Sequence, residues 1–191
     1  MYQPDIFRTT VSRLVAILRA HSVRFHLTGG ITSVAYGEPR MTQDVDVVVD
    51  NGAMAGALES FIAAAQQAGF LLDAASVRQA VADRSMFQLF DMSEALKVDL
   101  YPRELVPGEL DRSTWLEIFA GMHLPVASRT DAAASKLVWA AKGSHKSRRD
   151  LRQITRRMTA ADRAELDRLA GLLELDGLLA EVLAERDEIS G

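Results

Sequence analysis

Residues 44–50, with the sequence DVDVVVD, constrain the fold of this chain more than any other segment. Acids and valines alternate at its start, and a period of two is typical of a β-strand that buries one face. The run of valines continues to Asn51 and Gly52, which are typical of a turn. The segment therefore predicts a strand buried on at least one face, with Asp44 and Asp46 together on the other.

Asp44 and Asp46 lie about 7 Å apart along such a strand, because each residue rises about 3.3 Å. Two carboxylates at this spacing can converge on one or two divalent cations. A third acid, Asp99, lies between apolar neighbours in a second predicted strand at 97–101, and we expect it on the same face as the pair. Mg²⁺ or Mn²⁺ relieves the repulsion among three carboxylates and also binds the phosphates of a nucleoside triphosphate. The three acids are therefore the candidate metal ligands, and Asp99 is also the candidate general base.

Gly29 and Gly30 follow a predicted strand at 23–27 and precede a short helix. Glycines at this place let backbone N–H groups approach a phosphate without a Cβ in the way, and a helix N-terminus attracts anions. Ser33 adds a hydroxyl donor about one turn further on. We expect these three residues to hold the phosphates of a nucleotide beside the carboxylates.

The remaining pattern predicts a small mixed α/β module followed by helices. An amphipathic helix is expected at 4–20, an alanine-rich helix at 53–68, and strands at 87–90 and 97–101 joined by a hairpin-like connection. Beyond Asp111, the spacing of Leu, Ile and Ala predicts one short strand at 123–127 and helices at 130–142, 147–157, 160–173 and 175–187. We divide the chain into a core at 1–110 and a helical region at 111–191 that packs on it.

The chain has 191 residues, of which 48% are hydrophobic, and a formal net charge of −4. This composition suffices for a real core and excludes a disordered or fibrous protein. The absence of cysteine excludes disulfides, thiolate metal sites and cysteine nucleophiles. No apolar run approaches the length of a membrane span, and the first residues do not resemble a secretion signal. We therefore expect a soluble, cytoplasmic protein without a membrane partner.

Taken together, these features resemble the nucleotidyltransferase superfamily, which includes DNA polymerase β, the antibiotic nucleotidyltransferases and the minimal nucleotidyltransferases. The resemblance covers residues 23–103, in the order strand, Gly-Gly, short helix, Asp-x-Asp strand and a later strand with one Asp. It rests on Gly29, Gly30, Arg40, Thr42, Asp44, Asp46 and Asp99. It implies an α/β (α+β) fold with a short mixed sheet and flanking helices, metals on the three acids, and a nucleotide site that includes Arg40 and Thr42.

Two helical motifs in the second half resemble a narrower group, the abortive-infection (AbiEii-type) nucleotidyltransferase toxins. They are AAASKL at 132–137 and RRDLRQI at 148–154. By this resemblance Lys136 contacts the triphosphate, and Asp150 orients it or a neighbouring base. Ser147 departs from the pattern, because members of the group often carry a further acid there. The resemblance also implies the toxin of a toxin–antitoxin system, with a cognate antitoxin as a partner.

The function expected from these residues is transfer of a nucleoside monophosphate from NTP to an acceptor hydroxyl. Segment 142–157 carries seven Lys or Arg against one acid, whereas 158–191 carries nine acids against three Arg. The basic segment, Lys142–Arg157, predicts contact with a nucleic acid acceptor such as tRNA. A protein hydroxyl or a small molecule such as an antibiotic is an alternative acceptor.

Two other classes of protein are open on the sequence alone. One is a non-catalytic protein of the nucleotidyltransferase fold that binds a partner or a nucleic acid, as an antitoxin or regulator does. The presence of all three acids argues against such a decayed site. The other is a nucleotide-sugar glycosyltransferase, which the short chain and the lack of a Rossmann-like parallel pattern disfavour.

Overall fold

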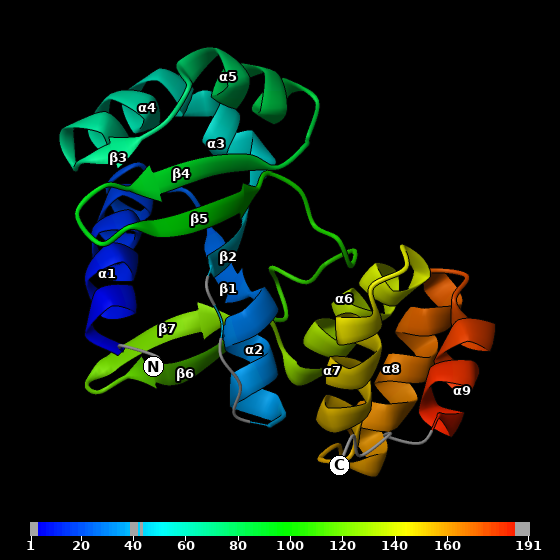
Figure 1. The fold of residues 1–191 in the computed structure, drawn as a ribbon. Coiled ribbons are helices and arrows are strands. Elements are labelled where there is room, and N and C mark those ends of the chain that lie inside the picture. The colour runs from blue at the N-terminus through cyan, green and yellow to red at the C-terminus, as the bar shows by residue number, and fades with distance from the viewer. Residues whose placement is uncertain (1–3, 39–41, 43, 186–191) are drawn as a thin grey trace.

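Within the residues that the structure describes, 4–38, 42 and 44–185, seven strands form one mixed sheet (Figure 1). The structure is a computed structural model. The strand order across the sheet is β3-β4-β5-β2-β1-β7-β6. In chain order the strands are β1 (Phe25–Thr28), β2 (Asp44–Val49), β3 (Phe70–Leu71), β4 (Phe87–Asp91), β5 (Leu96–Tyr101), β6 (Thr114–Phe119) and β7 (Met122–Val126). With helices around the sheet, this mixed architecture confirms the fold class expected from the sequence.

The strand predicted from the DVDVVVD segment is β2, and it lies at the centre of the sheet. It runs antiparallel to β1 on one side and parallel to β5 on the other. Val45, Val47 and Val49 are fully buried, and burial of each side chain contributes roughly 1.5–3 kcal/mol. The alternation thus fixes which face of β2 packs into the core, and it leaves Asp44 and Asp46 on the opposite face.

The helices of the first half pack against the sheet and against one another (Figure 1). They are α1 (Pro4–Ala20), α2 (Gly29–Tyr36), α3 (Asn51–Gly56), α4 (Leu58–Gln67) and α5 (Ala74–Ala82). The expected apolar stripe of α1 enters the core, where Val11, Leu14 and Leu18 have no exposed surface. The short helix α2 begins directly at the end of β1 and contacts both β1 and β2.

The helices of the second half lie together beside the sheet (Figure 1). They are α6 (Arg129–Ala141), α7 (His145–Thr155), α8 (Ala160–Leu172) and α9 (Asp176–Ala184), close to the predicted ranges. Ser128, Ser144 and Thr159 each cap a helix by accepting a hydrogen bond from a backbone N–H three residues on, a pattern that fixes where a helix begins. None of the described helices is long and apolar enough to cross a membrane.

Several elements differ from the sequence-based prediction. The expected helix at 53–68 is two helices, α3 and α4, because Ala57 has φ −106° and ψ 7°, and an alanine-rich sequence gives no signal for such a break. The elements β3 and α5 were not expected. The strand β6 was not expected either, because most of its residues are exposed or half-exposed and show no clean alternation. Since β6 and β7 join the sheet, residues 111–191 contribute more than helices, and the division of the chain at residue 110 stays a prediction.

A buried carboxylate, Asp91 at the end of β4, ties α1 to the sheet. Its Oδ2 atom accepts a hydrogen bond from Thr10 Oγ1 at 2.5 Å and forms an ion pair with Arg13. Its Oδ1 atom accepts hydrogen bonds from the backbone N–H of Ser93 at 3.0 Å and from the Ser93 hydroxyl at 2.8 Å. Burial alone would raise the pKa of Asp91, but the bonds from Thr10, Ser93 and Arg13 together lower it below its ordinary value.

We predict that Asp91→Ala lowers the free energy of unfolding by about 3–5 kcal/mol, because it leaves Arg13 without its buried partner. Because the folded-state pKa of Asp91 is lowered, its contribution is present above the unfolded-state pKa and is lost as the pH falls through the folded-state pKa. Urea denaturation at neutral and acidic pH measures both effects. Asp73→Ala, at the exposed N-cap of α5, is the control, with a smaller expected loss. A loss of the same size for both variants would contradict the assignment.

Candidate active site

One face of the sheet carries polar and charged side chains at its centre. The parallel register of β2 and β5 places Asp44 opposite Lys97 and Asp46 opposite Asp99. On the other side, Asp46 pairs with Thr28 at the end of β1. Neighbouring strands are about 5 Å apart, and side chains at paired positions share a face. The sheet therefore brings the three predicted acids to adjacent positions.

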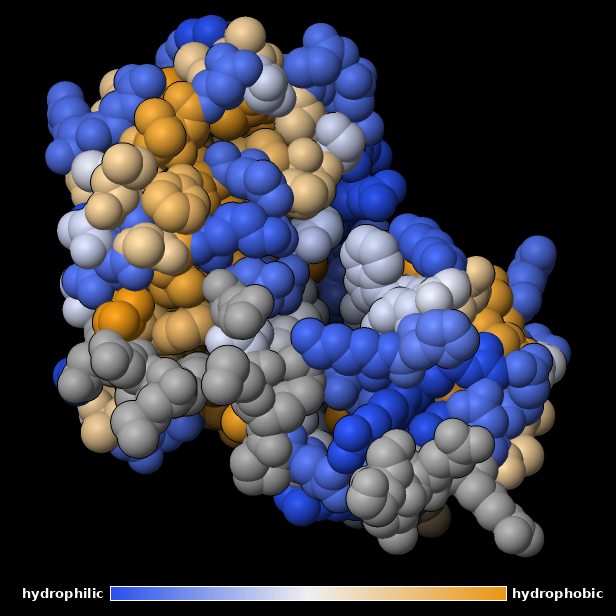
Figure 2. Space-filling view, viewed as in Figure 1, coloured by the Kyte–Doolittle hydropathy of each residue, from blue (hydrophilic) through white to orange (hydrophobic). Residues whose placement is uncertain are grey.

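A cavity of about 180 Å³ opens over Asp44 and Asp46, between the sheet and helices α6 and α7. Figure 2 shows the surface hollowed between these two parts of the molecule. Its sheet side is formed by Thr28, Gly29, Gly30, Asp44, Asp46, Val48 and Tyr101. Its helical side is formed by Ser135, Lys136, Trp139, Lys146 and Ser147. Of the predicted site residues, Gly29, Gly30, Asp44, Asp46 and Lys136 line this cavity directly.

The two glycines allow α2 to begin against β2. Gly29 has φ +62°, and a Cβ on it would lie 1.8 Å from Asp46 Oδ2. A Cβ on Gly30 would lie 2.1 Å from Thr42 Oγ1. Both contacts are far shorter than van der Waals distance, so only glycine fits at either position, and the φ of Gly29 also favours glycine. The helix N-terminus therefore sits directly beside the carboxylate of Asp46.

Lys136 on α6 and Asp150 on α7 form a buried ion pair at the helical side of the cavity. Lys136 Nζ lies 3.2 Å from Asp150 Oδ2, and both side chains are less than a tenth exposed. The hydroxyl of Ser33 on α2 donates to Asp150 Oδ2 at 3.0 Å and lies 2.9 Å from the carbonyl oxygen of Gly29. Ser33 and Asp150 are not part of the cavity lining. Instead they connect α2, α6 and α7, and so fix the position of Lys136 relative to the glycine turn.

The carboxylate of Asp46 is destabilised by its surroundings. Burial raises its pKa, and the nearby charges of Asp44 and Asp99 raise it further. Lys136 and a hydrogen bond from Tyr101 Oη, at 3.2 Å, act in the opposite direction without cancelling the shift. Burial and the charge of Asp46 in turn raise the pKa of Tyr101. The site therefore contains excess negative charge that a bound cation would offset.

Asp99 differs from the other two acids because both of its oxygens have partners within the sheet. Lys97 Nζ lies 2.9 Å from Asp99 Oδ2, and Gln88 Nε2 donates to Asp99 Oδ1 at 3.0 Å. Asp99 does not line the cavity. The same ammonium of Lys97 lies 4.0 Å from Asp44 Oδ2. The structure thus brings Asp99 close to the pair but couples it to Lys97.

The donors present in the cavity fit one divalent cation. Asp44 and Asp46 offer carboxylate oxygens, and Mg²⁺ is typically bound by one or two carboxylates together with water and substrate phosphates. Among the described residues, no group of three or more His, Asp or Glu side chains is arranged to hold a metal ion. Asp44 and Asp46 are therefore the residues that would hold the cation, and it would neutralise the charge that they concentrate.

The remaining two predicted nucleotide-binding residues lie in the segment before β2. Thr42 is buried, and its hydroxyl donates to Asp44 Oδ1 at 3.2 Å. Thr42 therefore orients a carboxylate and packs against Gly30. Arg40 lies outside the described residues.

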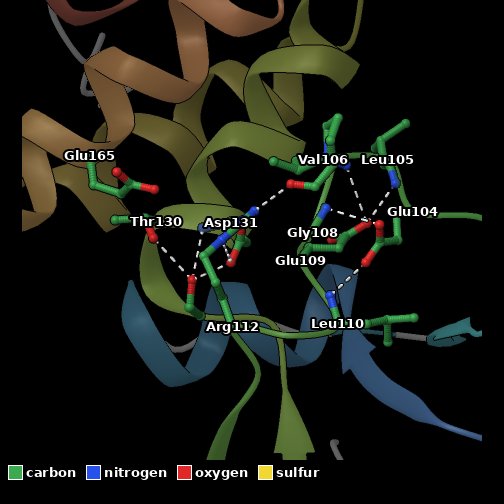
Figure 3. A network of polar contacts seen from close by, with 12 residues as sticks. Glu104, Leu105, Val106, Gly108, Glu109, Leu110, Arg112, Thr130, Asp131 and Glu165 are labelled. Atoms are coloured by element: carbon green, nitrogen blue, oxygen red, sulfur yellow. Dashed lines mark hydrogen bonds and ion pairs between the residues drawn. The ribbon is translucent and has the colours of Figure 1, made fainter.

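The segment between β5 and β6 supplies residues that sequence reasoning missed. Arg103, Leu105 and Glu109 from this segment line the cavity. Figure 3 shows how it is held: Glu109 accepts hydrogen bonds from the backbone N–H of Leu105 and Val106, at 2.6 and 3.3 Å, and Glu104 accepts from Gly108 and Leu110. Arg112 pairs with the buried Asp131 at the start of α6.

Buried Glu109 also lies 3.5 Å from His26 Nε2 on β1. No sequence motif marks Glu109, because its partners are backbone groups in a loop and a histidine far away in the chain. Tyr101 and Lys97 were more accessible to prediction, since both are two residues from Asp99 and therefore share its face.

The basic segment 142–157 is partly neutralised within the chain. Arg148 forms ion pairs with Glu181 and Glu185, and Arg152 pairs with Glu185. These contacts join α7 to Glu181 of α9 and to Glu185 at the C-cap of α9. Lys146, by contrast, lines the cavity.

The mixed sheet and its polar cavity agree with the class of protein that the sequence predicted, a nucleotidyltransferase. The sequence profile described as "Nucleotidyl transferase AbiEii toxin, Type IV TA system" matches residues 13–175. The chain belongs to this AbiEii nucleotidyltransferase family, as the motifs in its sequence predicted. No curated protein sequence matches the chain significantly.

A solved structure shows the same fold. The antibiotic-resistance factor ANT(2'')-Ia superposes with a TM-score of 0.61 at 14% identity, over 92% of this chain and 95% of that one. Two matches have lower TM-scores. The lincosamide antibiotic adenylyltransferase LnuA, bound to lincomycin, gives 0.46 at 14% identity, over 85% of this chain and 95% of that one. A nucleotidyltransferase-like protein from Paracoccidioides brasiliensis gives 0.47 at 18% identity, over 92% and 91%.

We predict that Asp46→Asn raises the free energy of unfolding of the metal-free protein at neutral pH. The folded-state pKa of Asp46 is raised, so its ionisation opposes folding fully above that pKa and not at all below the unfolded-state pKa of about 4. The gain should therefore shrink as the pH falls. Urea denaturation in EDTA at several pH values measures it. Asp83→Asn, an exposed change at the end of α5, should shift stability by less than about 0.5 kcal/mol. A loss of stability in Asp46→Asn at neutral pH would contradict this account.

Proposed function

We propose that this protein is a Mg²⁺-dependent nucleotidyltransferase, active also with Mn²⁺, that transfers NMP from NTP to an acceptor hydroxyl. The observation that carries the proposal is the convergence of four features on one cavity: Asp44, Asp46, the helix N-terminus at Gly29 and Gly30, and the ammonium of Lys136. The family and the fold support the reaction class. The geometry supports the assignment of these residues.

In this proposal the chain's residues bind and orient the triphosphate. Backbone N–H groups at Gly29 and Gly30 bind phosphate oxygens, since no Cβ obstructs them. Lys136, held by Asp150, presents a positive charge to the same phosphates. Asp44 and Asp46 hold the divalent cation, which supplies charge neutralisation at the reacting phosphate. Catalysis of this kind relies mainly on positioning and electrostatic stabilisation.

The covalent change is a displacement at the α-phosphorus. A bond forms between the acceptor oxygen and the α-phosphorus, and the bond from that phosphorus to the oxygen bridging to the β-phosphate breaks. The acceptor hydroxyl gives its proton to solvent water, and pyrophosphate leaves with the electron pair of the broken bond. Tyr101, whose pKa is raised by burial and by Asp46, stays protonated and continues to donate to Asp46.

We propose RNA, such as tRNA, as the acceptor, and the role of the toxin in a toxin–antitoxin pair. Lys146 lines the cavity, and Lys142, at the C-cap of α6, lies over the ring of Trp139, which also lines it, so cationic groups border the cavity. Phosphate contacts of this kind give affinity without sequence preference. The family description supports the toxin role, and a cognate antitoxin would then be the protein partner.

We predict that Asp44→Asn reduces transfer of label from α-labelled NTP by about 1,000-fold, with the fold unchanged by circular dichroism. The assay presents total RNA and total protein with each of the four NTPs and Mg²⁺. Asp83→Asn should keep full activity. Transfer by Asp44→Asn at the wild-type rate would refute the metal assignment. Label in protein instead of RNA would overturn the RNA acceptor, and the absence of both transfer and metal-dependent NTP binding in the wild type would favour the non-catalytic binding protein.

We predict that Lys136→Met weakens NTP binding by about 10- to 100-fold, because a charge-assisted contact to phosphate contributes about 1.5–3 kcal/mol. Equilibrium binding of a non-hydrolysable NTP measures this. Lys142→Met removes a positive charge that lies over the Trp139 ring, outside the cavity lining, and should leave NTP affinity within about 2-fold. Equal losses in the two variants would show that general charge, and not the position of Lys136, governs binding.

A further inference from the structure

Lys97 occupies an unusual place for a lysine, inside the group of acids. It stands on the same face of β5 as Asp99, and the register puts it opposite Asp44. Its ammonium lies 2.9 Å from Asp99 Oδ2 and 4.0 Å from Asp44 Oδ2. A single positive charge thus lies between two carboxylates that belong to different strands.

The pairing of Asp99 is close and shielded. Its side chain is 8% exposed, and its second oxygen accepts the hydrogen bond from Gln88. Removing such a carboxylate from its partners leaves charges without compensation, which is costly away from water. A metal ion on Asp99 would have to share its oxygens with the ammonium of Lys97 and the amide of Gln88, and Asp99 does not line the cavity through which the ion would arrive.

Asp44 and Asp46, unlike Asp99, are accessible from the cavity. Both line the cavity, and Asp46 is hydrogen-bonded only by the neutral hydroxyl of Tyr101 among the interactions described above. These two carboxylates are open to a cation, whereas the third is already neutralised. Among the described residues, no group of three acids is arranged to hold a metal ion. This agrees with two carboxylates that face the cavity and a third that is paired with Lys97.

We infer that Lys97 is a built-in cation that occupies the position of a second metal, so that the resting site binds one divalent ion through Asp44 and Asp46. Asp99 is then a positioning residue: it holds Lys97 and is neither a metal ligand nor the base that the sequence suggested. The inference rests on the proposed metal-dependent function and deepens it, because it assigns the number of ions and the role of a residue that no motif singles out.

The test is the number of Mn²⁺ ions bound to the full chain, counted by electron paramagnetic resonance of the free ion, without nucleotide. The wild type should bind one equivalent. Lys97→Met retains the length of the side chain but removes its charge, and it should bind a second equivalent between Asp44 and Asp99. Lys97→Arg restores a positive charge and should bind one. Circular dichroism checks that each variant is folded.

Asp99→Asn and Asp44→Asn form a matched pair of neutral substitutions. Asp99→Asn should keep the single site within about 2-fold in affinity, whereas Asp44→Asn should weaken it at least 10-fold. Two equivalents in the wild type, one unchanged equivalent in Lys97→Met, or loss of binding in Asp99→Asn would each overturn the inference and leave the proposed transfer reaction standing. No bound Mn²⁺ in the wild type would overturn the metal assignment itself, so the two failures are distinguishable.

Discussion

The ladder of β2 between β1 and β5 is the constraint on which the rest of the structure depends. Its valines pack into the core and thereby fix the strand's register and facing, since a slip of one residue would exchange the buried and polar faces. That register sets Asp46 beside Thr28 and Asp99, and Asp44 beside Lys97. The positions of the candidate site residues therefore follow from the burial of valines that do not line the cavity.

The sequence predicted the parts of the fold that have a strong local period. The valine alternation of β2, the stripe of α1 and the helices after residue 129 are examples, because each is determined by which side chains face the core. It did not predict β6, whose residues are largely exposed, nor the break at Ala57, which no residue type marks. It also missed α5, whose short apolar set is completed by contact with β4, α3 and α4.

For the candidate site, the placement of several predicted residues followed from the sequence, and their connectivity did not. The Asp-x-Asp pair and the Gly-Gly turn are adjacent in sequence to the strand that presents them, so their placement followed from period alone. The partners of Asp99 and the anchoring of Glu109 depend on strand pairing and on contacts between distant segments. Ser33 illustrates the difference: the sequence suggested a phosphate donor, whereas its hydroxyl joins Gly29 and Asp150 across α2 and α7.

The ion pairs between α7 and α9 have an electrostatic consequence for approach to the molecule. Glu181 and Glu185 pair with Arg148 and Arg152, so these two guanidinium groups contribute little net field beyond their immediate surroundings. Lys146 lies at the cavity instead, where the carboxylates of Asp44 and Asp46 oppose its charge. A polyanion near the protein would therefore be attracted less strongly than the basic sequence of α7 suggests, and the attraction would weaken further with ionic strength. The acidic residues at the end of α9 thus mask part of the positive charge that the sequence concentrates in segment 142–157.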